Sequence, residues 1–175
     1  EDSALSIGLD NVIREFVTMN IGTAAGSWVT RIGNQNLIMA CAHVAHDCVI
    51  EDEVIIGNNV LLAGHVLIES QAIISGGAAV SHFVTVGSLA MVGGMSRVMK
   101  DVPPYMVAEG GPAQVRRVNL VGLRRREKSQ EAVSQLRDAY RRLFADEAPT
   151  MLAIQEMEAS GGMEAETTHL LAFLR

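Results

Sequence analysis

Aliphatic residues recur at every sixth position through most of this chain. From Ile32 to Val98 each sixth residue is Ile, Val or Leu, and the residue four positions later is small or branched, from Ala42 to Val102. A spacing of six is neither the helical period nor simple strand alternation. It suits short strands joined by corners, three of which close one coil of a parallel β-helix. We therefore expect a mainly β protein whose six-spaced residues fill a triangular core.

The same spacing can be followed back toward the N-terminus, with one interruption. Ile7, Ile13 and Met19 keep the spacing, but it slips before Ile32, around the segment "TAAGSW". We expect this segment to bulge from the coil as a loop. At the regular corners, Gly57, Asn58 and Gly76 are residues that tolerate the positive φ a tight corner can require.

The pattern divides the chain into three parts. The prolines and glycines of "DVPPYMVAEGGPAQ", residues 101–114, predict a loop that leaves the coil. We therefore predict a β-helix over residues 1–103, a linker with a basic segment over 104–128, and a small α-helical domain over 129–175.

Helical spacing replaces the six-residue spacing in the last part. Ser129 is a suitable cap for an amphipathic helix that we expect to end at about Asp146. Two shorter helices are expected over 150–160 and 164–175.

Composition narrows the class of protein. Hydrophobic residues make up 49% of the chain and aromatic residues only 4%, so the core must be aliphatic. The net charge of −6 argues against nucleic-acid binding, and no apolar run is long enough to cross a membrane. Cys41 and Cys48 form no CxxC motif, so we interpret both as structural and expect a reduced, cytoplasmic setting. Neither a signal peptide nor an initiator Met is present, which fits the body of a longer chain.

Four of the five histidines are expected to lie on one face of the coil. Val44, Leu62 and Val80 are one coil apart, so His46, Gly64 and His82, two positions later, form a column, with His65 beside it. Coils stack about 4.8 Å apart, so these groups converge. His43 ends the preceding six-residue unit.

Each member of this column has a structural and a functional interpretation. His46 precedes Asp47, an acid that can orient the imidazole of a general base, although Asp47 also suits a corner. Gly64 either turns the corner or presents an N–H to an oxyanion. For His43, a surface role and a functional role are equally plausible.

A basic run lies between the coil and the helices. Six basic residues lie within thirteen positions of an otherwise acidic chain: Arg116, Arg117, Arg124, Arg125, Arg126 and Lys128. The run is either a solvated surface or a docking site for an anion, such as a nucleotide diphosphate or an acidic carrier protein.

Several motifs together carry a specific resemblance. "AHVAHDC", "LAGHV", "MVGG", "DVPPYMVAEG" and "VNLVGLRRR", in this order, resemble the acyl-(acyl-carrier-protein)–UDP-N-acetylglucosamine O-acyltransferase family, which begins lipid A synthesis. The resemblance covers nearly the whole chain. It implies a left-handed parallel β-helix followed by a C-terminal helical domain, and a homotrimer with sites between subunits. It also implies acyl carrier protein and UDP-N-acetylglucosamine as partners, with no cofactor and no metal.

The resemblance also implies roles for individual residues. His46 would be the general base, Asp47 its partner and Gly64 the oxyanion donor. The implied substrate-binding residues are His43, His65, Ser81, His82, Gly94, Asn119 and Arg125. The family usually has His-Gln before Phe where this chain has Ser81 and His82.

Two alternatives remain open. One is a γ-type carbonic anhydrase-like enzyme that binds zinc through three histidines, although that function would explain neither the arginine run nor the helical tail. The other is a non-catalytic hexapeptide-repeat scaffold that binds a carrier protein or a nucleotide.

Overall fold

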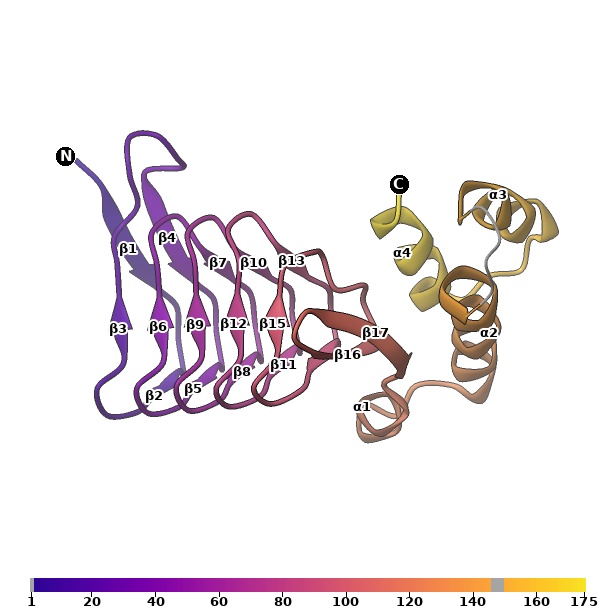
Figure 1. Ribbon diagram of the computed structural model, residues 1–175, viewed down its shortest axis with the longest axis horizontal. Coiled ribbons are helices and arrows are strands. Elements are labelled where there is room, and N and C mark those ends of the chain that lie inside the picture. The colour runs from indigo at the N-terminus through magenta and orange to yellow at the C-terminus, as the bar shows by residue number, and fades with distance from the viewer. Residues whose placement is uncertain (1, 146–149) are drawn as a thin grey trace.

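The computed structural model describes residues 2–145 and 150–175. In this part of the chain, short strands stack into the three sheets of a parallel β-helix (Figure 1). The first sheet contains β1 (Ala4–Ile7), β4 (Val29–Ile32), β7 (Val49–Ile50), β10 (Leu67–Ile68) and β13 (Thr85–Val86). The second contains β2 (Val12–Ile13), β5 (Leu37–Ile38), β8 (Ile55–Ile56), β11 (Ile73–Ile74) and β14 (Met91–Val92). The third contains β3 (Thr18–Met19), β6 (His43–Val44), β9 (Leu61–Leu62), β12 (Ala79–Val80) and β15 (Arg97–Val98).

The six-spaced residues form the core, as predicted. Val44 pairs with Leu62 and Leu62 with Val80, so residues one coil apart lie directly above one another. Ile50 and Ile56 are fully buried, as are most residues at these positions. Burial of each such side chain contributes roughly 1.5–3 kcal/mol to folding. The parallel β-helix followed by a helical region is thus confirmed.

Most corners of the coil turn on one residue in the left-handed conformation. This residue comes three positions after the inward aliphatic residue, as at Asp47 (φ 59°), Asn59 (φ 57°) and Gly77 (φ 71°). The expectation of positive φ at Gly57, Asn58 and Gly76 is therefore wrong by one or two positions. The bend falls later because the residue after the strand still continues the backbone ladder, as the bond from the Gly57 N–H to the carbonyl of Ile74 shows.

The slip in the spacing corresponds to an inserted loop. The chain leaves β3 at Met19 and returns to the first sheet at Val29, and Figure 1 shows this segment projecting beyond the neighbouring corners. The bulge predicted around "TAAGSW" is confirmed. One coil on, the corresponding corner takes only the four residues between β6 and β7.

The strand pairing continues past Pro103. β16 (Met106–Gly110) pairs in parallel with β14 and in antiparallel with β17 (Ala113–Val118), so both strands extend the second sheet. The expectation that residues 101–114 form only a loop is therefore wrong. Met106 and Ala108 are buried, and that burial keeps the segment on the coil.

The helical region follows β17. It contains α1 (Leu120–Arg125), α2 (Gln130–Tyr140), the π-helical turn η1 (Arg141–Ala145), α3 (Thr150–Ser160) and α4 (Ala165–Phe173). Ser129 caps α2 as predicted, because its hydroxyl accepts the Ala132 N–H at 2.9 Å. The expected regular helix instead changes to a π-helical turn at Arg141, and its predicted end, Asp146, lies outside the described residues. The two shorter helices are confirmed.

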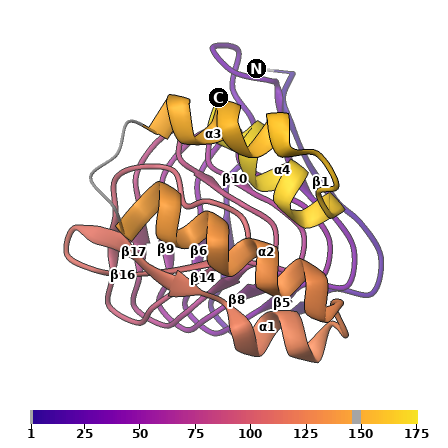
Figure 2. The same cartoon turned by 90° about the vertical axis from the view of Figure 1, so that its right-hand side faces the viewer.

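A second core attaches these helices to the coil. Leu89, Tyr105 and Met106 of the coil cluster with Leu123 of α1 and Leu136 of α2. Figure 2 shows the helices lying across this end of the coil.

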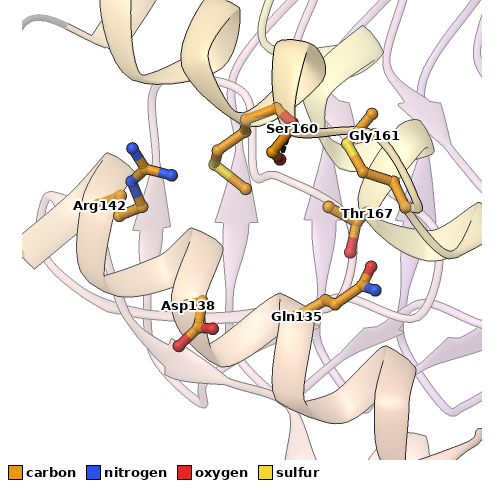
Figure 3. A pocket seen from close by; sticks show the side chains of 8 residues that line it. Gln135, Asp138, Arg142, Ser160, Gly161 and Thr167 are labelled. Atoms are coloured by element: carbon orange, nitrogen blue, oxygen red, sulfur yellow. Dashed lines mark hydrogen bonds between the residues drawn. The ribbon is translucent and has the colours of Figure 1, made fainter.

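The helical region also contains a cavity. Its volume is about 170 Å³, and Figure 3 shows Gln135, Asp138, Arg142, Ser160 and Thr167 in its lining. These residues come from α2, η1, α3 and α4, so the cavity lies between the helices and outside the coil that carries the histidine column.

Candidate active site

The histidine column lies at the corner between the third and first sheets. His46 and Asp47 occupy this corner between β6 and β7, and Gly64 and His65 occupy it one coil later. The His46 side chain is 39% exposed, whereas that of Asp47 is 1% exposed. An accessible imidazole thus rests on a buried carboxylate.

At least four hydrogen bonds from the described residues hold the Asp47 carboxylate. Oδ1 accepts the backbone N–H groups of Thr23 at 3.0 Å and Ser27 at 2.9 Å. Oδ2 accepts the Thr23 hydroxyl at 2.7 Å and lies 2.9 Å from Nδ1 of His46. The inserted loop after β3 therefore wraps the carboxylate and donates three of these hydrogen bonds, whereas the imidazole contributes one.

These contacts keep Asp47 ionised. Burial acts to raise the pKa of its carboxyl, but the hydrogen bonds from Thr23, His46 and Ser27 outweigh burial and hold the pKa well below its usual range. An ionised Asp47 accepts a hydrogen bond from the Nδ1–H of His46. That arrangement leaves Nε2 of a neutral His46 as a base.

Gly64 lies against the His46 ring. A Cβ at Gly64 would lie 2.6 Å from Cε1 and 2.7 Å from Nε2 of that ring, closer than real Cβ atoms come. The absence of a side chain therefore makes room for the imidazole. Within the described residues, no protein acceptor takes the N–H of the buried Gly64, so this donor is unpaired beside the imidazole.

His65 and Phe83 extend the site along the column. Nε2 of His65 lies 4.0 Å from Oδ2 of Asp47, and the rings of His46 and His65 meet edge to face at 5.2 Å. Phe83 stacks on the His65 ring at 4.6 Å. A cavity of about 460 Å³ opens beside Asp47, His65 and Phe83.

Two other histidines, His43 and His82, flank this centre. Nδ1 of His43 lies 2.8 Å from the Thr18 hydroxyl. His82 is exposed, Ser81 is half-buried, and both belong to the next corner of the column. The coil thus brings His43, His46, His65 and His82 to one side of the molecule, as their spacing predicted.

Three predicted substrate-binding residues lie elsewhere. Gly94 is at a corner between the second and third sheets, where a Cβ would meet only the Gly76 carbonyl at 3.5 Å. Asn119 is buried, and its side chain donates to the Leu89 carbonyl at 2.8 Å and accepts the Gly122 N–H at 3.0 Å. Asn119 therefore caps α1 and ties it to the coil.

Arg125 is exposed in the last turn of α1. In the part of the chain that the structure describes, neither Arg124 nor Arg125 forms an ion pair, whereas Arg126 pairs with Glu53. Two adjacent guanidinium groups are thus available to an external anion.

His46, Asp47 and His65 also offer ligand atoms within 4.8 Å of one another, close enough to test as a metal site. However, the four hydrogen bonds described above already use the lone pairs of the Asp47 carboxylate. A cation would have to displace at least one of them. The donor set fits a hydrogen-bonded dyad better than a metal centre.

Sequence reasoning missed the residues that position the dyad. Thr23 and Ser27 were expected only as part of a bulging loop, and the buried Thr30 hydroxyl, which accepts the Asp47 N–H at 2.8 Å, carried no recognised signal. The sequence signal for this loop was the slip in the six-residue spacing. An insertion that interrupts a regular coil beside a candidate base indicates that the inserted loop contributes to the site.

Comparisons with known proteins agree with this geometry. A family model described as Udp N-acetylglucosamine O-acyltransferase, Domain 2, matches residues 101–175, and one described as bacterial transferase hexapeptide (six repeats) matches residues 30–64. No helix of the described residues is long and apolar enough to cross a membrane.

Individual relatives carry the same description. Acyl-(acyl-carrier-protein)–UDP-N-acetylglucosamine O-acyltransferase of Synechocystis sp. is 51% identical over 99% of this chain, and that of Anaeromyxobacter dehalogenans is 43% identical over 100%. The chain spans 62% of the first relative and 68% of the second. The crystal structure of a UDP-N-acetylglucosamine acyltransferase from Bacteroides fragilis 9343 superposes with a TM-score of 0.96 at 39% identity, covering 100% of this chain and 68% of that one.

Proposed function

The chain belongs to the UDP-N-acetylglucosamine O-acyltransferase family, and we propose that it moves an acyl chain, as a 3-hydroxyacyl group, from acyl carrier protein to the 3-hydroxyl of UDP-N-acetylglucosamine, the first step of lipid A synthesis. The observation that supports this most directly is the pairing of the accessible His46 with the buried Asp47 at 2.9 Å, beside the Gly64 N–H, which has no acceptor among the described residues.

The reaction needs a base because a sugar hydroxyl is too weak an acid to attack a thioester unaided at neutral pH. His46 accepts the hydroxyl proton at Nε2 as the oxygen attacks the thioester carbonyl. Asp47, held as an anion, stabilises the imidazolium through Nδ1. A positioned imidazole of this kind typically contributes about 10²- to 10⁴-fold to the rate.

The remaining steps use the same corner. The Gly64 N–H donates to the oxyanion of the tetrahedral intermediate. When the intermediate collapses, the carbon–sulfur bond breaks, and the imidazolium of His46 returns its proton to the departing thiolate of the carrier arm. The products are the O-acylated sugar and the free carrier thiol, and the base is regenerated.

The substrates extend away from this centre in both directions. The proposed contacts for the nucleotide sugar are the residues that border the catalytic centre, namely His43, His65, Ser81 and His82. On the donor side, Asn119 and the exposed Arg125 meet the acyl carrier arm, and Gly94 leaves room near the end of the acyl chain. This division assigns acceptor recognition to the coil and donor recognition largely to the segment after it.

A homotrimer would complete the site. The His46 side chain is 39% exposed and the neighbouring Phe83 is 72% exposed, so this face has too few walls to enclose a nucleotide sugar and an acyl chain. A second subunit packed against this face supplies the missing wall. A monomeric mass in solution with full activity after dilution would contradict this. We further propose that the reaction takes place in the cytoplasm, where the free thiols of Cys41 and Cys48 stay reduced.

A turnover assay tests the function. The full-length protein is incubated with several acyl carrier thioesters and several UDP-sugars, and the release of free carrier thiol is followed. We expect turnover with UDP-N-acetylglucosamine, and a loss in kcat of at least about a hundredfold in His46→Ala with the fold intact. Nucleotide-sugar binding without turnover in the wild-type protein would instead indicate a binding scaffold.

The cluster of His46, Asp47 and His65 supports one second candidate, a zinc hydratase related to γ-type carbonic anhydrases. That function requires bound metal in the purified protein and activity that a chelator abolishes. The acyltransferase proposal predicts instead that acyl transfer survives chelation, so a metal analysis run beside the turnover assay separates the two.

A further inference from the structure

The inserted loop between β3 and β4 makes more contacts with the Asp47 carboxylate than the imidazole does. Thr23 and Ser27 donate three hydrogen bonds to this carboxylate, and the imidazole contributes one. Gly26 also approaches it closely, since a Cβ there would lie 2.3 Å from the Asp47 Cγ. The loop therefore encloses the carboxylate on the sides that the imidazole leaves free.

We propose that the inserted loop is part of the base's machinery, with Thr23 as a positioning residue that acts on His46 through Asp47. The loop fixes which way the carboxylate faces and leaves Oδ2 directed at Nδ1 of His46. This inference rests on the proposed function for its kinetic consequences, but its structural consequence can be measured separately.

The arrangement at Oδ2 explains why the Thr23 hydroxyl matters. This oxygen accepts the hydroxyl at 2.7 Å and the imidazole at 2.9 Å, so the two donors share its negative charge. The hydroxyl thus limits how strongly Asp47 attracts a proton onto His46, and it also restricts rotation of the carboxylate. The second effect keeps Oδ2 on the Nδ1–H of the imidazole, which leaves Nε2 free.

Isosteric replacement of the hydroxyl isolates this effect. Thr23→Val removes the bond to Oδ2 but keeps the Thr23 N–H that donates to Oδ1. We expect kcat to fall about tenfold. The acid limb of the pH profile of kcat should move upward, because Oδ2 then carries more charge toward the imidazolium. Thr23→Ser should recover most of both changes.

A matched control lies at a different corner. The Ser70 hydroxyl donates to Oε2 of Glu51 at 2.8 Å, a similar hydroxyl–carboxylate bond made outside the histidine column. Ser70→Ala should leave both kcat and the acid limb unchanged. A general weakening of the coil would affect the two variants alike.

A double-mutant cycle gives the decisive kinetic result. If Thr23 acts through Asp47, then Thr23→Val should add little to the loss already caused by Asp47→Asn. Equal losses in the wild-type and Asp47→Asn backgrounds would overturn the proposal.

A measurement that needs no turnover separates this inference from the proposed function. Nitrogen NMR of the full-length protein reports which nitrogen of His46 carries the proton, and we expect Nδ1–H in the wild type with an altered titration in Thr23→Val. An unchanged His46 titration in Thr23→Val would overturn the inference even if acyl transfer is found. Absence of acyl transfer with an altered titration would refute only the proposed function.

Discussion

The close approach of Gly64 to His46 permits a specific test of the base. Gly64→Ala adds a single methyl group at a position without positive φ, so the backbone accepts it. That Cβ would lie 2.6 Å from Cε1 and 2.7 Å from Nε2 of His46. The methyl group and the imidazole cannot both keep these positions, and the half-exposed ring is the group free to move.

The size of the effect follows from this overlap. Carbon atoms in contact sit about 3.5–4.0 Å apart, so the ring must shift by about 1 Å. A misplacement of that size costs about a hundredfold in rate, equivalent to about 2.7 kcal/mol of transition-state stabilisation. The N–H at residue 64 is retained, so the loss would come from the base and not from the oxyanion donor.

The assay is steady-state acyl transfer from the carrier thioester to UDP-N-acetylglucosamine, with thermal unfolding measured in parallel. Gly76→Ala is the matched control, because Gly76 occupies the same position in its six-residue unit and a Cβ there meets only backbone, at 3.3 Å. It should keep nearly normal kcat.

The cycle with His46→Ala identifies the mechanism of the loss. Without the ring, the added methyl group has nothing to displace, so Gly64→Ala should cause little further decrease in the His46→Ala background. The reasoning is refuted if Gly64→Ala retains kcat within about threefold of wild type while the protein stays folded. It is also refuted if the two losses simply add.

Three further predictions concern other parts of the molecule. Replacing the exposed Arg124 and Arg125 by Ala should raise KM for the carrier thioester about tenfold at low salt and flatten its salt dependence, with KM for the sugar unchanged. An unchanged donor KM would make them ordinary surface charges. Burial, together with the charges of nearby Glu166 and Glu69, raises the pKa of Tyr105 to about 12. Because the folded state keeps this phenol protonated while the unfolded state ionises near pH 10, about 2–3 kcal/mol of stability should disappear as the pH rises from about 10 to 12. Denaturant titrations should show this loss in wild type and much less of it in Tyr105→Phe. Ile56→Ala, at a fully buried core position, should lower the free energy of unfolding by about 2–5 kcal/mol in the same titrations, and a loss below about 1 kcal/mol would contradict the packing described.

The sequence by itself determined the repeating part of this protein. Each coil uses the same local contacts, and parallel strands in register place residues one coil apart above one another. The spacing of Val44, Leu62 and Val80 was therefore enough to bring His46, Gly64 and His82 to one corner. The cap at Ser129 was equally readable, since capping involves residues only three positions apart.

Only the tertiary structure decided what the non-repeating segments do. The bonds from Thr23 and Ser27 to Asp47 join residues more than 19 positions apart through an irregular loop, and no periodicity encodes the path of such a loop. Asn119 likewise binds the carbonyl of Leu89 across 30 positions, which makes it a structural cap as well as a predicted substrate contact. Repeats fix contacts through local spacing, whereas these bonds depend on where the rest of the chain packs. The pairing of His46 with Asp47 could thus be predicted from the sequence, whereas the hydrogen bonds from Thr23 and Ser27 that hold Asp47 could not.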